Sequence, residues 1–90
     1  MEKELKERLE KYLKLTKRAL SIIKINEGNK EIANDLLDLA NRYYQDALYF
    51  KEKNDLINAF AAVNYSHAFL DAGCRIKAFK NKNNKLFMAD

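Results

Sequence analysis

The chain has 90 residues, of which 48% are hydrophobic and 33% are charged, with two glycines and no proline. This length is that of one domain, and the apolar fraction excludes a mostly disordered chain. Proline breaks helices and glycine weakens them. Their scarcity therefore favours long helices and argues against an all-β fold, which needs many glycine- and proline-rich turns.

Cysteine content and hydropathy favour a cytoplasmic protein. Cys74 is the single cysteine, which excludes an internal disulfide. The chain is charged from its second position and begins without the apolar core of a signal peptide. The longest apolar stretch, residues 56–74, contains asparagine, serine, histidine and aspartate side chains that a membrane span rarely carries. We therefore expect no membrane among the partners.

Positive charge gathers at both ends of the chain. The net charge of +4 divides into +4 over residues 1–25, −2 over residues 26–54 and +2 over residues 55–90. Nucleic-acid-binding proteins usually concentrate their charge more strongly. Solvated helix faces and a basic tail explain most of this pattern, and nucleic-acid binding stays open as an alternative.

The first predicted helix spans residues 2–25. Its apolar residues, among them Leu5, Leu9 and Leu13, recur at helical spacing between lysines and glutamates. A turn is expected at residues 26–29, because Gly28 and its asparagine neighbours tolerate the positive φ that ends helices.

The second predicted helix spans residues 30–53. Its apolar stripe is typical of a helix packed on one side against partners and consists of Ile32, Leu36, Leu39, Tyr43, Ala47 and Phe50. Residues 54–55 then interrupt the pattern, with Asp55 as the expected N-cap of the next helix.

The third predicted helix spans residues 56–79 and is apolar nearly all round. Such a helix lies at the centre of its bundle or is covered by a second chain. Small side chains let another helix approach closely, so we expect close packing or an interface at Ala59, Ala62, Phe69 and Gly73. A glycine inside a helix costs roughly 1 kcal/mol relative to alanine, and Gly73 therefore indicates close helix approach beside Asp71.

The chain is expected to divide into a bundle over residues 1–80 and a basic tail over residues 81–90. Between Asp71 and Asp90 the basic residues have no acidic neighbour, and the candidate phosphate contacts among them are Lys77, Lys80, Lys82 and Lys85. The tail also carries Leu86, Phe87 and Met88, which we expect to dock back onto the bundle.

One side of the third predicted helix carries a line of polar residues. Asn64, His67, Asp71 and Arg75 follow one another at spacings of 3, 4 and 4. His67 and Asp71 have the spacing of an acid–base pair, in which the carboxylate orients the imidazole. The structural alternative, which we favour, is an ion pair between Asp71 and Arg75 together with one buried hydrogen bond from His67.

No motif indicates a metal, a cofactor or a nucleophile. His67, Asp71 and Cys74 fall within two turns, but three ligands from one helix rarely converge on one ion. The sequence has no CxxC or HExxH motif and no glycine-rich phosphate loop. Cys74 is expected in the core. The sequence therefore predicts no catalytic residue, no metal site and no cofactor.

Three segments resemble a known archaeal family, namely YYQDALYFKEKND, AFAAVNYSHAFLDAG and CRIKAF. This family is the domain of unknown function 357, and the resemblance covers roughly residues 40–88. The matching positions are Tyr44, Asp46, Ala47, Phe50, Asp55, Ala59, Tyr65, His67, Leu70, Asp71, Ala72, Gly73 and Arg75, and Leu86-Phe87 resembles the closing element of the family. The departures are mild: Phe69 replaces a tryptophan and Asn54 replaces a glycine, while Ser66 and Ala68 stand at positions of small residues.

The resemblance implies a three-helix bundle with no established activity. It adds Tyr65 to the candidate polar cluster, which then consists of Asn64, Tyr65, His67, Asp71 and Arg75. Some members of the family look fused to nucleotidyltransferase-like domains, which implies an accessory or assembly role.

These observations together predict an all-α protein, a three-helix up-down-up bundle with long helices and a short basic C-terminal tail. The expected function is a non-enzymatic interaction or assembly module that binds a protein partner or itself through the third helix. The first alternative is an RNA- or nucleotide-associated accessory protein that uses basic residues of the first helix and the tail. The third possibility is an enzyme with His67 and Asp71 as an acid–base pair.

Overall fold

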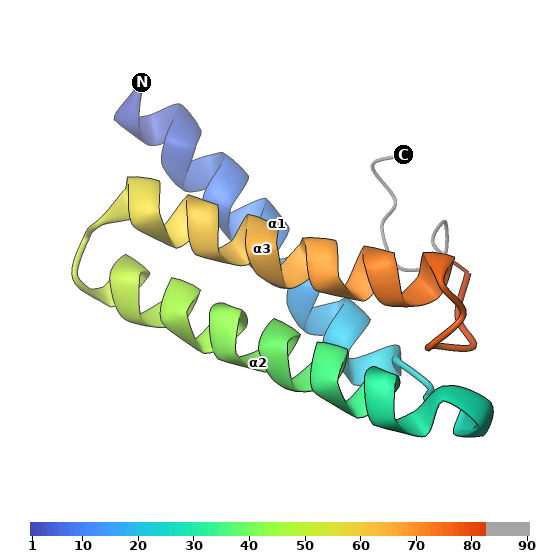
Figure 1. Ribbon diagram of the computed structural model, residues 1–90. Coiled ribbons are helices and arrows are strands. Elements are labelled where there is room, and N and C mark those ends of the chain that lie inside the picture. The colour runs from blue at the N-terminus through green and yellow to red at the C-terminus, as the bar shows by residue number, and fades with distance from the viewer. Residues whose placement is uncertain (83–90) are drawn as a thin grey trace.

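The computed structural model describes residues 1–82, which form three α-helices and one short 3-10 turn. The helices are α1 (Glu2–Ile22), α2 (Lys30–Glu52) and α3 (Leu56–Arg75), and the 3-10 turn η1 (Glu27–Asn29) precedes α2. Successive helices run in alternating directions, and the molecule extends over 44 × 23 × 17 Å (Figure 1). The prediction of three helices and no strand is confirmed for the part of the chain that the structure describes.

The helices α2 and α3 lie side by side along their length, whereas α1 crosses them at an angle (Figure 1). On α2 the side chains that face α3 are small, because Ala33, Ala40 and Ala47 recur every seven residues and are fully buried. This spacing keeps one narrow stripe against the neighbour and lets the two backbones approach closely. Ser66 of α3 donates a hydrogen bond to the Ala40 carbonyl at 2.7 Å, which fixes the register of the pair.

The core consists of two apolar clusters arranged along the helices. One contains Ala19, Ala33, Ala40, Leu70, Cys74, Ala78 and Phe79. The other contains Leu9, Leu13, Ala47, Leu56, Ala59, Ala62 and Val63. Thr16 and Ser66, both fully buried, lie between the two clusters along α1 and α3. Among residues 1–82 the Thr16 hydroxyl finds no hydrogen-bond partner.

The turn between α2 and α3 closes through backbone hydrogen bonds around Asn54. Asn54 has a φ of 60°, and the amides of Asn54 and Asp55 donate to Lys51 and Phe50 at 2.9 and 2.8 Å. This is a Schellman-type helix end, in which asparagine replaces the usual glycine. The Asp55 side chain accepts from the Asn58 amide at 3.2 Å. The predicted break and the predicted N-cap are therefore confirmed.

The end of α3 differs from the prediction, because the helix ends at Arg75 and not at residue 79. Lys77 has a φ of 63°, and the Ala78 and Lys77 amides donate to Gly73 and Cys74 at 2.8 and 3.2 Å. The chain therefore leaves the helix through a second Schellman-type end, with a lysine in the left-handed position. Apolar periodicity continues past this point, because Ala78 and Phe79 are buried without being helical.

The segments after α1 and after α3 join in what we call the clasp, which comprises residues 22–29 and 77–81. The first predicted helix was also too long, since α1 ends at Ile22. Ile25 pairs with Phe79 in an antiparallel bridge, flanked by backbone bonds from Asn26 to Ala78 at 2.9 Å and from Lys80 to Lys24 at 2.8 Å. Asparagine side chains complete the clasp, which draws on Asn26, Asn29 and Asn81.

The clasp explains why residue 73 is a glycine. A Cβ at Gly73 would overlap the Phe79 ring, which lies against the helix at this point and is only 2% exposed. The close approach expected at Gly73 therefore involves an aromatic side chain that follows the same helix, and not a neighbouring helix. Lys85 and the apolar residues Leu86, Phe87 and Met88 lie outside the described residues.

Candidate functional site

The structure divides the candidate polar cluster between two sides of α3. Asn64, His67, Asp71 and Arg75 follow one edge of α3 at helical spacing. This edge meets α1 at His67, whose ring lies at a centroid distance of 6.3 Å from the Tyr12 ring of α1. Tyr65 lies on the opposite side and stacks on Tyr43 of α2. The expectation that Tyr65 belongs with His67 is therefore wrong, because residues two apart on a helix point about 200° apart.

Asp71 takes part in the ion pair that the structural alternative predicts. The Arg75 Nε lies 3.3 Å from Asp71 Oδ2, one helical turn away. His67 is half-buried, and its ring shares the Tyr12 contact with Phe60, whose ring lies edge-on to Tyr12 at 5.6 Å. These side chains join α1 to α3. Within residues 1–82, no three His, Cys, Asp or Glu side chains are grouped so that they could hold a metal ion.

Cys74 is buried in the cluster nearest the clasp, with 7% of the residue exposed. Burial raises the pKa of its thiol to about 11, and the negative charge of Asp71 adds to this shift. The thiol is therefore protonated near neutral pH, and the thiolate is the reactive form of cysteine. Cys74 contributes apolar packing to the fold.

A stack of three aromatic rings lies on the side of the α2–α3 pair that faces away from α1. The Tyr43 ring lies between Tyr65 at 5.2 Å and Phe69 at 5.7 Å, with interplanar angles of 28° and 21°. Tyr65 remains 58% exposed. Aromatic side chains with a large solvent-facing area are typical of interaction surfaces.

The exposed surface of α3 next to this stack carries no charge. Ala61, Tyr65, Ala68, Ala72 and Ile76 recur at spacings of 4, 3, 4 and 4, which places them on one face, and all five are exposed. We call the combined surface the outer face, and it consists of Tyr43, Ala61, Tyr65, Ala68, Phe69, Ala72 and Ile76. It lies opposite to Phe60 and His67, the residues of α3 that contact Tyr12. The helix α1 therefore covers one side of the α2–α3 pair and leaves the outer face open.

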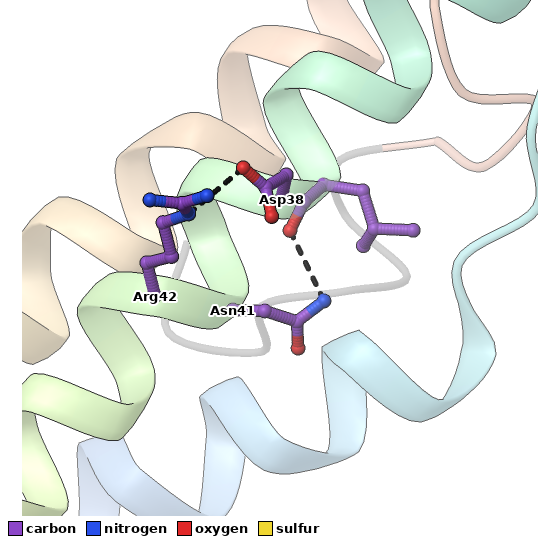
Figure 2. A network of polar contacts seen from close by, with 4 residues as sticks. Asp38, Asn41 and Arg42 are labelled. Atoms are coloured by element: carbon purple, nitrogen blue, oxygen red, sulfur yellow. Dashed lines mark hydrogen bonds and ion pairs between the residues drawn. The ribbon is translucent and has the colours of Figure 1, made fainter.

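The surface of α2 carries polar side chains at Asp38, Asn41 and Arg42 (Figure 2). Arg42 and Asp38 form an ion pair at 2.9 Å, and both side chains are more than half exposed. Asn41 donates from its side chain to the Leu37 carbonyl at 3.1 Å. Charged groups that pair with each other on a solvated helix are the ordinary surface of a folded domain. Exposed apolar side chains also occur elsewhere, at Ile32, Tyr49 and Ile57, but on the outer face they follow one another over four turns.

The four residues expected at close packing or at an interface lie in different places. Ala59 and Ala62 are inside the fold with Leu9 and Leu13, and Gly73 lies beneath Phe79. Phe69 alone contributes to the outer face. The sequence interpretation missed Ala61, Ala68 and Ala72. Their spacing with Tyr65 and Ile76, free of any charge over four turns, is the signal that could have identified them.

The candidate phosphate contacts lie at the clasp. Lys80 and Lys82 line a shallow hollow together with Lys24 and Asn81. Lys77 is exposed at the left-handed position after α3, and Lys85 lies outside the described residues. The structure thus adds Lys24, which follows α1, to the basic residues that the sequence places near the end of the chain.

Comparison with protein families gives a match, over residues 11–79, to the family described as "Protein of unknown function (DUF357)". The matched segment contains α2, α3 and the second half of α1, and it ends at Phe79 of the clasp bridge. Comparison with curated proteins gave no match, and comparison with solved structures gave none either. None of the three described helices is long and apolar enough to cross a membrane.

Proposed function

This chain belongs to the family DUF357, and we propose that it is a non-enzymatic assembly module that pairs with a second copy of itself through the outer face. The observation that carries this proposal is the uncharged, exposed surface around Tyr65 of α3 and Ile76, the residue that follows α3, which are 58% and 56% exposed. Monomeric proteins rarely expose contiguous apolar surface larger than a few hundred Å², and such surface marks interaction sites.

The proposed architecture is an up-down-up bundle in which α1 covers one side of α2 and α3, and the second copy covers the other. This arrangement accounts for the apolar residues on all sides of α3, because each side then has a neighbour. The chain has a single cysteine and so no internal disulfide, which favours the cytosol as the compartment of the assembly.

The size of the outer face suits a weak, reversible dimer. A helix of 20 residues is about 30 Å long and about 10 Å across, and Tyr43 of α2 adds to the width of the face. The face therefore offers about 300–400 Å² per copy, or about 600–800 Å² in total, which is in the range of transient association. We expect association that depends on protein concentration.

The order of large and small residues along α3 supports a second copy as the occupant. If two α3 helices pack antiparallel about a two-fold axis between Ala68 and Phe69, each large side chain meets a small one. Tyr65 then faces Ala72 of the second copy, Ile76 faces Ala61, and Phe69 faces Ala68. A two-fold interface requires such self-complementarity, and alternation of large and small residues is how packed layers interdigitate.

A swap of one large and one small residue tests this arrangement. We expect Tyr65→Ala and Ala72→Tyr each to weaken the dimer, by a gap and by a collision respectively, and the double variant to restore it. Each dimer of Tyr65→Ala loses two aromatic side chains worth about 1.5–3 kcal/mol apiece when buried, so its Kd should rise about a hundredfold or more. Sedimentation measures the mass against the 10.5 kDa of one chain.

Two arginine substitutions, one on the outer face and one beside it, form a matched test and control. Ala68→Arg should give a monomer, because it buries two unpaired charges in the interface. Asn64→Arg, on the same exposed helix but outside the outer face, should leave the mass unchanged. A monomeric native chain at high micromolar concentration would contradict the proposal, as would equal effects of the two arginines.

A further inference from the structure

Lysine side chains meet at the clasp because the backbone pairing places them there. The bridge between Ile25 and Phe79 sets an antiparallel register in which Lys24 lies opposite Lys80, and the Lys80 amide donates to the Lys24 carbonyl at 2.8 Å. Opposite residues of an antiparallel pair have their side chains on the same side. Lys24, Lys80 and Lys82 accordingly line one hollow with Asn81.

This arrangement holds like charges together, and no carboxylate of residues 1–82 lines the hollow to neutralise them. Like charges directly opposite each other in an antiparallel pair are destabilising. The ion pairs within residues 1–82 involve Glu4, Glu10, Asp38 and Asp71, and none includes a lysine of the hollow. The fold therefore maintains a fixed positive site, and an anion bound there would relieve the repulsion.

Basic residues extend the positive surface away from the hollow. Residues 11–26 contain five basic residues and no acidic one, namely Lys11, Lys14, Lys17, Arg18 and Lys24. Residues 72–82 contain four more and no acidic one, namely Arg75, Lys77, Lys80 and Lys82. The first half of the clasp contains one acidic residue, Glu27 of η1, and Glu31 follows at the start of α2. The basic surface is thus longer than a single phosphate group.

We propose that the clasp hollow binds the phosphodiester backbone of RNA, without reading its sequence. Lysine ammonium groups bind phosphate as point charges. Asn81, the other residue of the hollow, is already engaged, because its side chain accepts from the Lys24 amide at 2.7 Å and donates to the Ile22 carbonyl at 2.9 Å. The Asn81 amide is therefore held against the backbone of the clasp, and the lysine charges are the main groups that the hollow offers to a ligand. This proposal is independent of the outer face.

Two triple variants with the same net charge test the site. The clasp variant combines Lys24→Gln, Lys80→Gln and Lys82→Gln. The control combines Lys3→Gln, Lys6→Gln and Lys53→Gln, three exposed lysines at the opposite end of the helices. Each variant lowers the net charge from +4 by three. Fluorescence anisotropy of a labelled single-stranded RNA of mixed sequence, measured against salt concentration, reports binding by the 90-residue chain.

We expect the clasp variant to bind the RNA at least about tenfold more weakly at low salt. The slope of the logarithm of its binding constant against the logarithm of salt concentration should be smaller in magnitude by about 2, because three phosphate contacts are lost. The control variant should bind within about twofold of the native chain. Equal losses in the two variants would overturn the proposal, and so would no binding by the native chain at low salt.

Competition with inorganic phosphate and pyrophosphate distinguishes RNA from a small phosphate ligand. If RNA is the ligand, millimolar phosphate or pyrophosphate should displace it no better than added chloride of equal ionic strength. Specific displacement at lower concentration would overturn RNA in favour of a free phosphate compound. Sedimentation of the clasp variant should give the mass of the native chain, so failure of this proposal and failure of the dimer are separate results.

Discussion

Gly73 lies inside α3, where a glycine is about 1 kcal/mol less favourable than alanine. The ring of Phe79 fills the space that its missing Cβ leaves. Phe79 is the largest fully buried side chain of the fold and anchors the clasp to the end of the helix. The intrinsic cost of the glycine is therefore offset by an aromatic contact that a larger residue would prevent.

Replacement of this glycine should destabilise the protein despite the better helix propensity of alanine. We expect Gly73→Ala to lower the free energy of unfolding by about 1–3 kcal/mol, the usual cost of overpacking. Urea unfolding followed by circular dichroism measures it. In a Phe79→Leu background the same substitution should cost less, because the smaller side chain leaves room. A stabilised Gly73→Ala would show that Phe79 does not occupy this space.

Cys74 makes the stability of the fold sensitive to alkaline pH. Burial raises the pKa of its thiol from 9.0 to about 11 in the folded chain. Below pH 9 both the folded and the unfolded chain keep the proton. Between pH 9 and about 11 the unfolded chain loses it first, so stability falls as pH rises. The difference in unfolding free energy between the native chain and Cys74→Ala should shrink over this range. A difference independent of pH would contradict the raised pKa.

At the scale of the secondary-structure elements, α2 and α3 end in the same type of turn. Both α2 and α3 end in a Schellman-type turn, with Asn54 and Lys77 at left-handed φ values of 60° and 63°. Asparagine tolerates this conformation, whereas a lysine there is strained by its Cβ. The Lys77 carbonyl accepts hydrogen bonds from the side chains of Asn26 and Asn29 at 2.9 and 3.0 Å. These contacts hold the strained residue in place.

Glycine at position 77 should relieve this strain. We expect Lys77→Gly to raise the free energy of unfolding by about 0.5–1 kcal/mol, since the lost Cβ clash outweighs the greater freedom of glycine in the unfolded chain. The backbone carbonyl that the two asparagines use is retained. Lys30→Gly, at an ordinary helical φ of −57°, is the control and should destabilise. Thermal unfolding of both variants measures the change in the free energy of unfolding.

The sequence predicted the helices better than it predicted where they end. Apolar periodicity identified all three helices, and the asparagine–aspartate pair at residues 54–55 identified one boundary correctly. The boundary after α3 was missed because Ala78 and Phe79 continue the apolar pattern while belonging to the clasp. Periodicity reports burial, and it does not distinguish a buried helix from a buried extended segment. The clasp pairs Ile25 with Phe79, which are far apart in the chain. Pairing between such distant segments leaves no local signal in the sequence.

At the scale of the whole molecule, the position of α1 determines which surface is available. Tyr65 and His67 are close in sequence, and the family resemblance joined them in one cluster. Tyr12 of α1 lies against His67 on one side of α3. Tyr65 lies on the other side, where it stacks on Tyr43 of α2 and remains exposed to solvent. Helical spacing alone separates the two sides of α3. It does not say which side α1 covers, and that choice required the three-dimensional structure.

The clasp also has a consequence for the order of folding. Lys24 and Asn81, which it joins, are 57 residues apart in the chain, whereas α2 and α3 are connected by a turn of three residues. Contacts between segments close in sequence form first, because a long loop loses more entropy when it closes. The α2–α3 hairpin should therefore assemble early and the clasp last. The lysines of the clasp would then come together in the final step, so the positively charged hollow exists only once the rest of the protein has folded.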